Sequence, residues 1–107
     1  MNSGLTQTIK DEITSTPVIV YSKSYCPFCV RAKNTLKQKG VNFTAIELDT
    51  LSNGSAIQDA LRDISGQTTV PNVFVGGEHV GGNDNVQKEV KNGSFFKRLQ
   101  KHGISVQ

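Results

Sequence analysis

The amino-acid sequence predicts an α/β fold in which a four-stranded mixed sheet is flanked by about five helices. Apolar residues alternate between helical spacing and short unbroken runs, in the order α-β-α-β-α-β-β-α-α. An early strand, helix and strand occupy about 30 residues, which is typical of a parallel βαβ unit with a right-handed crossover. Because 107 residues is a common size for one domain, we expect residues 1–107 to form a single domain.

The chain is expected to begin with a helix and a buried strand. Leu5, Ile9 and Ile13 recur every four residues, which predicts an amphipathic helix. This helix ends before Pro17, because the residue preceding a proline is pushed out of helical geometry. The unbroken apolar run at 18–21 is typical of a central strand covered on both faces.

A second helix and strand complete the βαβ unit. Cys29, Ala32 and Leu36 share one helical face, and Gly40 supplies the end of that helix. Residues 43–48 then predict a second strand, parallel to the first.

The second half is expected to fold as a helix, a hairpin and two further helices. Ser55 and Gln58 form a possible capping box for the first of these helices. Strands at 72–75 and 78–80 are separated by Gly76-Gly77, a strong hairpin signal. A helix follows from about residue 83. The apolar residues that these helices are expected to bury are Ile57, Ala60, Leu61, Ile64, Phe95, Phe96 and Leu99.

Composition and charge exclude several classes of protein. No apolar run approaches the roughly 18 residues that a membrane span needs, and the N-terminus lacks the pattern of a signal peptide. The net charge of +3 favours anionic partners only weakly. Two cysteines cannot hold together a secreted miniprotein. We therefore expect a cytoplasmic, reducing environment, in which a close cysteine pair does redox or metal chemistry.

The sequence Cys26-Pro27-Phe28-Cys29 lies where the buried strand gives way to a helix. Helical residues three apart lie about 5–6 Å from each other, within the separation that a disulfide tolerates. Cys26 would face the unpaired N–H groups and the positive end of the helix dipole, with Lys23 just before it. Because these groups favour a thiolate, we predict that Cys26 attacks disulfides and that the less exposed Cys29 resolves the product.

Two other interpretations of the cysteine pair remain open, half of a zinc site and a pair of inert core thiols. Zinc needs further ligands, and neither His79 nor His102 has ligand spacing. Inert thiols would give no packing reason for a cysteine beside a proline at a helix start. A c-type haem attachment needs histidine after the second cysteine, where this chain has Val30.

The sequence resembles the dithiol type of the glutaredoxin family, a branch of the thioredoxin-like fold. The resemblance covers roughly residues 17–99 and rests on three separated motifs, at 23–29, 66–71 and 81–84. Thioredoxin itself is a poorer match, since its motif carries a tryptophan before the first cysteine and this chain has no tryptophan.

The resemblance implies glutathione-dependent thiol–disulfide exchange, with Cys26 and Cys29 as catalytic residues and glutathione as reductant. Val70 would offer backbone groups to glutathione in the manner of an added strand, beside a cis Pro71. The helix that begins near Asp84 would take a carboxylate of glutathione on its free N–H groups. The residues that the resemblance assigns to glutathione binding are Lys23, Phe28, Gln58, Thr69, Val70, Pro71, Gly82, Asn83 and Asp84.

Purely structural roles are the alternative for several of these residues. Lys23 could be an ordinary solvated lysine, Gln58 could serve only its capping box, and Asp84 could only complement its helix dipole. Val70-Pro71 could be a plain junction between a loop and a strand.

The expected partners are glutathione and proteins that carry a glutathione mixed disulfide or an internal disulfide, with no metal or permanently bound cofactor. We expect a monomer that binds neither nucleic acid nor membrane. The basic residues of the last helix are interpreted as a solvated face; they are Lys97, Arg98, Lys101 and His102. Two rival functions are an iron–sulfur carrier, in which Cys26 of two chains and two glutathiones hold a cluster, and a thioredoxin-like protein reduced by a flavoprotein.

Overall fold

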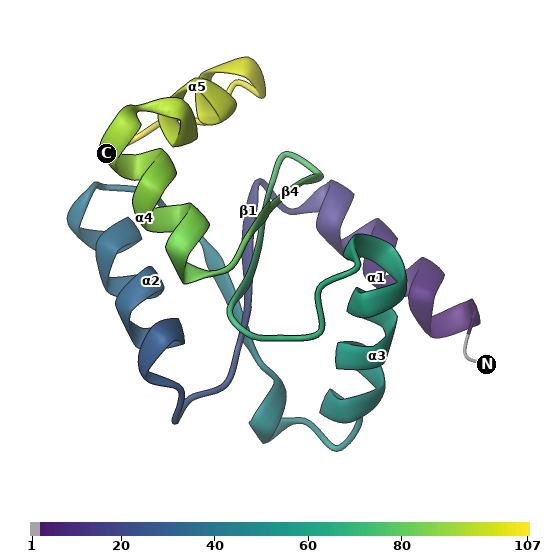
Figure 1. The fold of residues 1–107 in the computed structure, drawn as a ribbon. Helices are drawn as coiled ribbons and strands as arrows, with labels where there is room; N and C mark the ends of the chain where they lie inside the picture. The colour runs from purple at the N-terminus through teal and green to yellow at the C-terminus, as the bar shows by residue number, and fades with distance from the viewer. Residues whose placement is uncertain (1–2) are drawn as a thin grey trace.

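The computed structural model describes residues 3–107, and its elements follow the predicted order (Figure 1). The helices among these residues are α1 (Ser3–Ser15), α2 (Pro27–Gln38), α3 (Gly54–Ser65), α4 (Asn83–Asn92) and α5 (Ser94–Lys101), with a 3-10 turn η1 (Leu48–Thr50). The strands are β1 (Val18–Ser22), β2 (Thr44–Glu47), β3 (Asn72–Val75) and β4 (Glu78–Gly81). The predicted α/β class is confirmed.

The strands form one mixed sheet in the order β2-β1-β3-β4. β1 runs parallel to β2, with Val20 opposite Ala45, which confirms the predicted βαβ unit around α2. β1 runs antiparallel to β3, with Tyr21 opposite Asn72. The end of β1 and the start of β3 therefore lie at the same edge of the sheet, where the loop to α2 and the loop from α3 meet.

Helices cover both faces of the sheet, α1 and α3 on one side and α2 and α4 on the other (Figure 1). Side chains of β1 alternate between the two layers, as the period of a strand requires. Val18 and Val20 pack with α2, α4 and α5, whereas Ile19 and Tyr21 pack with α1 and α3. All four side chains are buried, so the prediction of a central strand covered on both faces is confirmed.

The hairpin between β3 and β4 turns at the predicted pair of glycines. Gly76 has a φ of +57° and Gly77 a φ of +85°. A two-residue turn of this kind needs left-handed backbone at both positions, where a side chain would be strained.

The structure corrects two local expectations. β2 spans Thr44–Glu47, so Phe43 precedes it and Leu48 already belongs to η1, with a buried side chain. η1 passes so close to α3 that a Cβ at Gly54 would lie 1.9 Å from the carbonyl oxygen of Leu48. This close approach makes glycine necessary at the first residue of α3.

α3 therefore begins before the serine that was expected to cap it. Asn53 is the N-cap, and no side chain donates or accepts a capping hydrogen bond there. The predicted capping box of Ser55 and Gln58 is wrong, because Ser55 already lies inside the helix.

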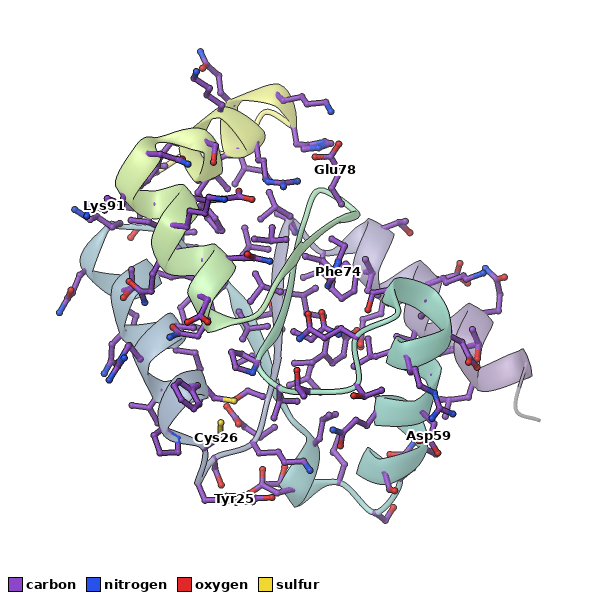
Figure 2. The ribbon with its side chains drawn as sticks, in the orientation of Figure 1. Tyr25, Cys26, Asp59, Phe74, Glu78 and Lys91 are labelled. Atoms are coloured by element: carbon purple, nitrogen blue, oxygen red, sulfur yellow. The ribbon has the colours of Figure 1, made fainter. Side chains whose placement is uncertain are left out.

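Two basic residues of α5, Arg98 and Lys101, pair with acidic side chains of neighbouring elements. Arg98 pairs with Glu89 at 2.7 Å and with Glu78 at 3.3 Å, and Lys101 pairs with Glu78 at 2.7 Å. Phe95 and Leu99 are buried, as predicted. Figure 2 shows Glu78 near α5 at one end of the molecule and Cys26 at the other end.

None of the helices within residues 3–107 combines the length and the apolar character needed to cross a lipid bilayer.

Candidate active site

Cys26 is the N-cap residue of α2, at the point where the loop from β1 enters the helix. Its backbone is extended, with a φ of −85° and a ψ of 117°, and Pro27 begins the helix. The Cys26 sulfur accepts a hydrogen bond from the backbone N–H of Cys29 at 3.4 Å. The sulfur thus takes the place that a serine or aspartate oxygen takes in an ordinary cap, facing the positive end of the helix dipole.

The surroundings of Cys26 favour its thiolate. Burial raises the pKa of this thiol, yet the Cys29 side chain and the backbone N–H groups of Cys29 and Phe28 donate hydrogen bonds that lower it. The charge of Lys23 lowers the same pKa, and the net pKa lies below the ordinary value of a cysteine. A thiolate is the nucleophile in disulfide exchange, so this position suits an attacking cysteine.

The surroundings of Cys29 favour its protonated thiol instead. Its side chain is fully buried, at 0% exposure. Burial raises the pKa of Cys29, the backbone of Lys23 and the hydroxyl of Ser22 lower it in part, and Cys26 raises it again. The net pKa lies above the ordinary value, so Cys29 remains a thiol when Cys26 is ionised. These two directions agree with the predicted division of roles.

A carboxylate from η1 fixes the loop before Cys26. Both oxygens of Asp49 accept hydrogen bonds from Ser24, one from its backbone N–H at 2.9 Å and the other from its hydroxyl. The same loop closes on itself, because the Cys26 N–H donates to the Lys23 carbonyl at 3.1 Å. These bonds hold Lys23 and Cys26 in a defined relation to each other.

A groove of about 560 Å³ lies beside Cys26. It is lined by Phe28, Gln67, Thr69, Val70, Pro71, Gly82, Asn83, Asp84 and Asn85. The Cys26 sulfur lies 3.9 Å from the carbonyl oxygen of Val70, which places the sulfur at the edge of this groove. The Val70–Pro71 peptide bond is cis, as predicted.

The start of α4 forms another wall of the groove. Its N-cap is Gly82, and no side chain caps the first N–H groups of the helix. The buried side chain of Asn83 points inward and accepts a hydrogen bond from Gln87 at 3.1 Å. Asp84 is exposed in the first turn. Free N–H groups at a helix start bind carboxylates well, so this wall can hold an acidic ligand.

The structure brings together most of the residues assigned to glutathione binding, but Lys23 and Gln58 do not line the groove. Lys23 lies close enough to act on Cys26 through its charge. The amide of Gln58 donates to the carbonyl of Thr68 at 2.6 Å, so this side chain supports the loop before Pro71.

Sequence reasoning missed two residues of the groove, Gln67 and Asn85. The Gln67 amide donates to the carbonyls of Thr69 and Pro71, each at 2.9 Å, and so holds both sides of Val70. Gln67 belongs to the sequence motif at 66–71, but the sequence does not show which carbonyls its side chain contacts, because the folded loop determines them. Asn85 lies in the first turn of α4 and donates to the carbonyl of Val80 at 3.2 Å.

Large apolar side chains surround the mouth of the site. Tyr25 is 71% exposed and Phe28 57% exposed, and Figure 2 shows Tyr25 at the outer end of the molecule, beside Cys26. Within residues 3–107, no three His, Cys, Asp or Glu side chains gather in a way that could hold a metal ion.

Comparisons with known proteins agree with this geometry. The family model described as glutaredoxin matches residues 18–80. The chain is 48% identical over 97 residues to Glutaredoxin-C2 of Arabidopsis thaliana, covering 91% of this chain and 87% of that one. It is 50% identical over 94 residues to Glutaredoxin-C6 of Oryza sativa subsp. japonica, covering 88% and 84%. The crystal structure of a buckwheat glutaredoxin–glutathione complex is similar, with a TM-score of 0.90, 41% identity, and 96% and 94% of the two chains covered.

Proposed function

Because this chain belongs to the glutaredoxin family and is a glutathione-dependent thiol–disulfide oxidoreductase, we propose that it reduces both protein–glutathione mixed disulfides and disulfides within proteins. One observation carries this proposal: a cysteine with a lowered pKa lies at the rim of a groove whose far wall is a helix start. The first feature supplies a nucleophile, and the second supplies a place for an acidic peptide.

In the monothiol route, the Cys26 thiolate attacks the glutathione sulfur of a mixed disulfide. A bond forms between Cys26 and glutathione, the original disulfide breaks, and the protein substrate leaves as a thiolate. A second glutathione thiolate then attacks the glutathione sulfur bound to Cys26 and releases oxidised glutathione. Cys26 is a good leaving group in this last step, because its thiolate is stabilised.

In the dithiol route, Cys26 attacks a disulfide within a protein and stays joined to one of its sulfurs. Cys29, one helical turn away, then attacks the Cys26 sulfur and displaces the reduced substrate. Two glutathione molecules reduce the Cys26–Cys29 disulfide. This route therefore needs Cys29, whereas the monothiol route does not.

Glutathione carries two carboxylates, an ammonium group and a thiol, and the groove offers a complement to three of these four groups. The N-terminus of α4 suits one carboxylate, the Asp84 side chain suits the ammonium, and the backbone of Val70 suits the cysteine of glutathione. Outside the groove, Lys23 is the residue that we propose for the other carboxylate, as the family resemblance implies. The structure of a buckwheat relative in complex with glutathione supports this assignment of the ligand.

Substitution of each cysteine tests the two routes. Cys29→Ser should keep the release of glutathione from a glutathionylated peptide and lose most of the reduction of a cyclic disulfide peptide. Cys26→Ser should lose both activities. The assay couples oxidised glutathione to glutathione reductase and follows the consumption of NADPH. Reduction of the cyclic peptide by Cys29→Ser at the rate of the unmodified protein would refute the dithiol assignment.

We further propose that the protein acts as a monomer in a reducing compartment such as the cytoplasm. Neither proposed route uses a residue of a second subunit, because Cys26, Cys29 and the groove residues belong to the same chain. Sedimentation of the anaerobically purified protein tests this proposal. A colourless monomer is expected, and a brown dimer would instead favour the iron–sulfur carrier.

A further inference from the structure

The dithiol route requires a buried thiol to lose its proton. Cys29 is 0% exposed and has a pKa above the ordinary value, so few molecules carry a Cys29 thiolate at neutral pH. Because the Cys29 side chain is out of contact with solvent, a group of the protein is needed to accept the proton.

A chain of polar side chains leads away from Cys29 toward the surface. The hydroxyl of Ser22, itself 0% exposed, can donate a hydrogen bond to the Cys29 sulfur and so lowers the pKa of Cys29. Ser22 Oγ also donates a hydrogen bond to Glu47 Oε1 at 2.8 Å. Glu47 lies in β2, next to the end of β1 that carries Ser22, because the two residues are direct partners in the parallel pairing.

The carboxylate at the end of this chain reaches solvent. The second oxygen of Glu47 accepts a hydrogen bond from Lys33 Nζ at 2.7 Å. The side chains of Lys33 and Glu47 are 16% and 25% exposed. The series of polar side chains therefore begins at a fully buried sulfur and ends at a partly exposed carboxylate.

We propose that Ser22 and Glu47 form a proton relay that takes the proton from Cys29 during the dithiol route. This inference rests on the proposed dithiol activity. As Cys29 attacks, its S–H proton passes to Ser22 Oγ, while the hydroxyl proton of Ser22 passes to Glu47. The Cys29–Cys26 bond forms, the bond from Cys26 to the substrate breaks, and the substrate sulfur leaves with the electron pair. Glu47 then releases the proton to water, so the relay returns to its first state.

The hydrogen-bond directions suit such a transfer. A serine hydroxyl has one proton and two lone pairs, so Ser22 can donate to Glu47 while it accepts from the Cys29 thiol. Once Cys29 is ionised, the same hydroxyl can rotate and donate to the thiolate. Both arrangements leave the buried hydroxyl of Ser22 with a hydrogen-bond partner.

Among the residues that the structure describes, few charged groups lie near the Cys29–Ser22–Glu47 series of polar side chains. Lys33 of α2 faces Glu47, Cys26 faces Cys29, and Lys23 lies on the loop beside them. Asp49 of η1 is hydrogen-bonded to Ser24 on the same loop. Glu47 is therefore the carboxylate that the structure connects to Cys29.

The test compares the two routes in the same variant. Glu47→Gln keeps the size of the side chain and removes the proton acceptor. We expect the ratio of the dithiol rate to the monothiol rate to fall by about 10²-fold at neutral pH, the low end for a positioned base. Ser22→Ala should lower the ratio similarly. The dithiol step is measured in a single turnover with a cyclic disulfide peptide, and the monothiol step with a glutathionylated peptide.

Two further variants separate the relay from a structural effect. Lys33→Gln breaks the same ion pair but leaves the carboxylate. The ratio of the dithiol rate to the monothiol rate should therefore fall at least about tenfold less in Lys33→Gln than in Glu47→Gln. Glu12→Gln is a matched control, because Glu12 accepts a hydrogen bond from the hydroxyl of Tyr21 on the other face of the sheet. Its ratio should equal that of the unmodified protein.

The pH profile supplies the decisive measurement. In Glu47→Gln the loss should shrink as the pH rises, because hydroxide then ionises Cys29 without the relay. An equal loss at every pH, or an equal loss in Lys33→Gln, would overturn the relay and assign Glu47 a structural role. An unchanged ratio in Glu47→Gln would also overturn it, while leaving the proposed function intact. Failure of the unmodified protein on both peptides would instead refute the proposed function.

Discussion

Gly82 offers a direct test of where glutathione lies, because a methyl group fits there in the free protein. Gly82 has a φ of −90° and a ψ of −167°, a backbone that any residue adopts. A Cβ at this position would lie 3.6 Å from the carbonyl oxygen of Pro71 and 3.8 Å from Gln67 Nε2, both ordinary contacts. Gly82→Ala should therefore lower the free energy of unfolding by no more than about 1 kcal/mol, the cost of placing alanine at the N-cap of α4.

The same methyl group lies beside two other residues that line the groove, Pro71 and Gln67, so we expect it to occupy space that the proposed ligand needs. An extra methyl group in a packed contact costs about 1–3 kcal/mol. Since about 1.4 kcal/mol corresponds to a tenfold change in affinity, we expect glutathione to bind about tenfold or more weakly to Gly82→Ala.

Calorimetric titration with a thioether analogue of glutathione measures this affinity without thiol exchange. Gly4→Ala is a suitable control, because nothing lies within 4 Å of a Cβ at Gly4 in the exposed part of α1. That variant should bind the analogue normally and gain about 0.5–1 kcal/mol of stability. Unchanged affinity in a folded Gly82→Ala would show that the ligand does not contact this wall of the groove.

The remaining predictions concern charge and packing. Alkylation of Cys26 by iodoacetamide should reach half its plateau rate below the pH typical of a cysteine, because its pKa is lowered, and acidification should suppress it. Lys23→Gln should move that midpoint upward, since the Lys23 charge lowers this pKa, and an unmoved midpoint would contradict the geometry. Phe95→Ala, at a fully buried position, should lower the free energy of unfolding in urea by about 3–5 kcal/mol. Arg98→Ala should lower it by only about 0.2–1 kcal/mol, and less at high salt, because its ion pairs are partly exposed.

The order of elements and the position of Cys26 followed from local features of the sequence. A run of apolar residues before a proline-containing helix start is a short-range pattern, and it placed Cys26 at the N-cap of α2. The hairpin turn also depends on adjacent residues alone, since Gly76 and Gly77 adopt the backbone that other residues avoid. Such features need no knowledge of the rest of the fold.

Contacts between distant segments could not be predicted in the same way. Glu47 meets Ser22 and Lys33 only because β2 pairs with β1 under α2. The start of α3 was misjudged for a similar reason, because the crowding of Gly54 against Leu48 involves the fold of η1. The spacing of charged residues along the sequence does not indicate these tertiary contacts.

The two cysteines share a single turn of α2, with the Cys26 sulfur already hydrogen-bonded to the Cys29 backbone. Oxidation can therefore join them with little rearrangement of the surface around Tyr25 and Phe28. We therefore expect the reduced and oxidised proteins to present nearly the same surface to a partner protein. What differs is the negative charge at Cys26, which disappears when the disulfide forms. A partner protein that binds the reduced form and releases the oxidised form must therefore distinguish them by this difference in charge.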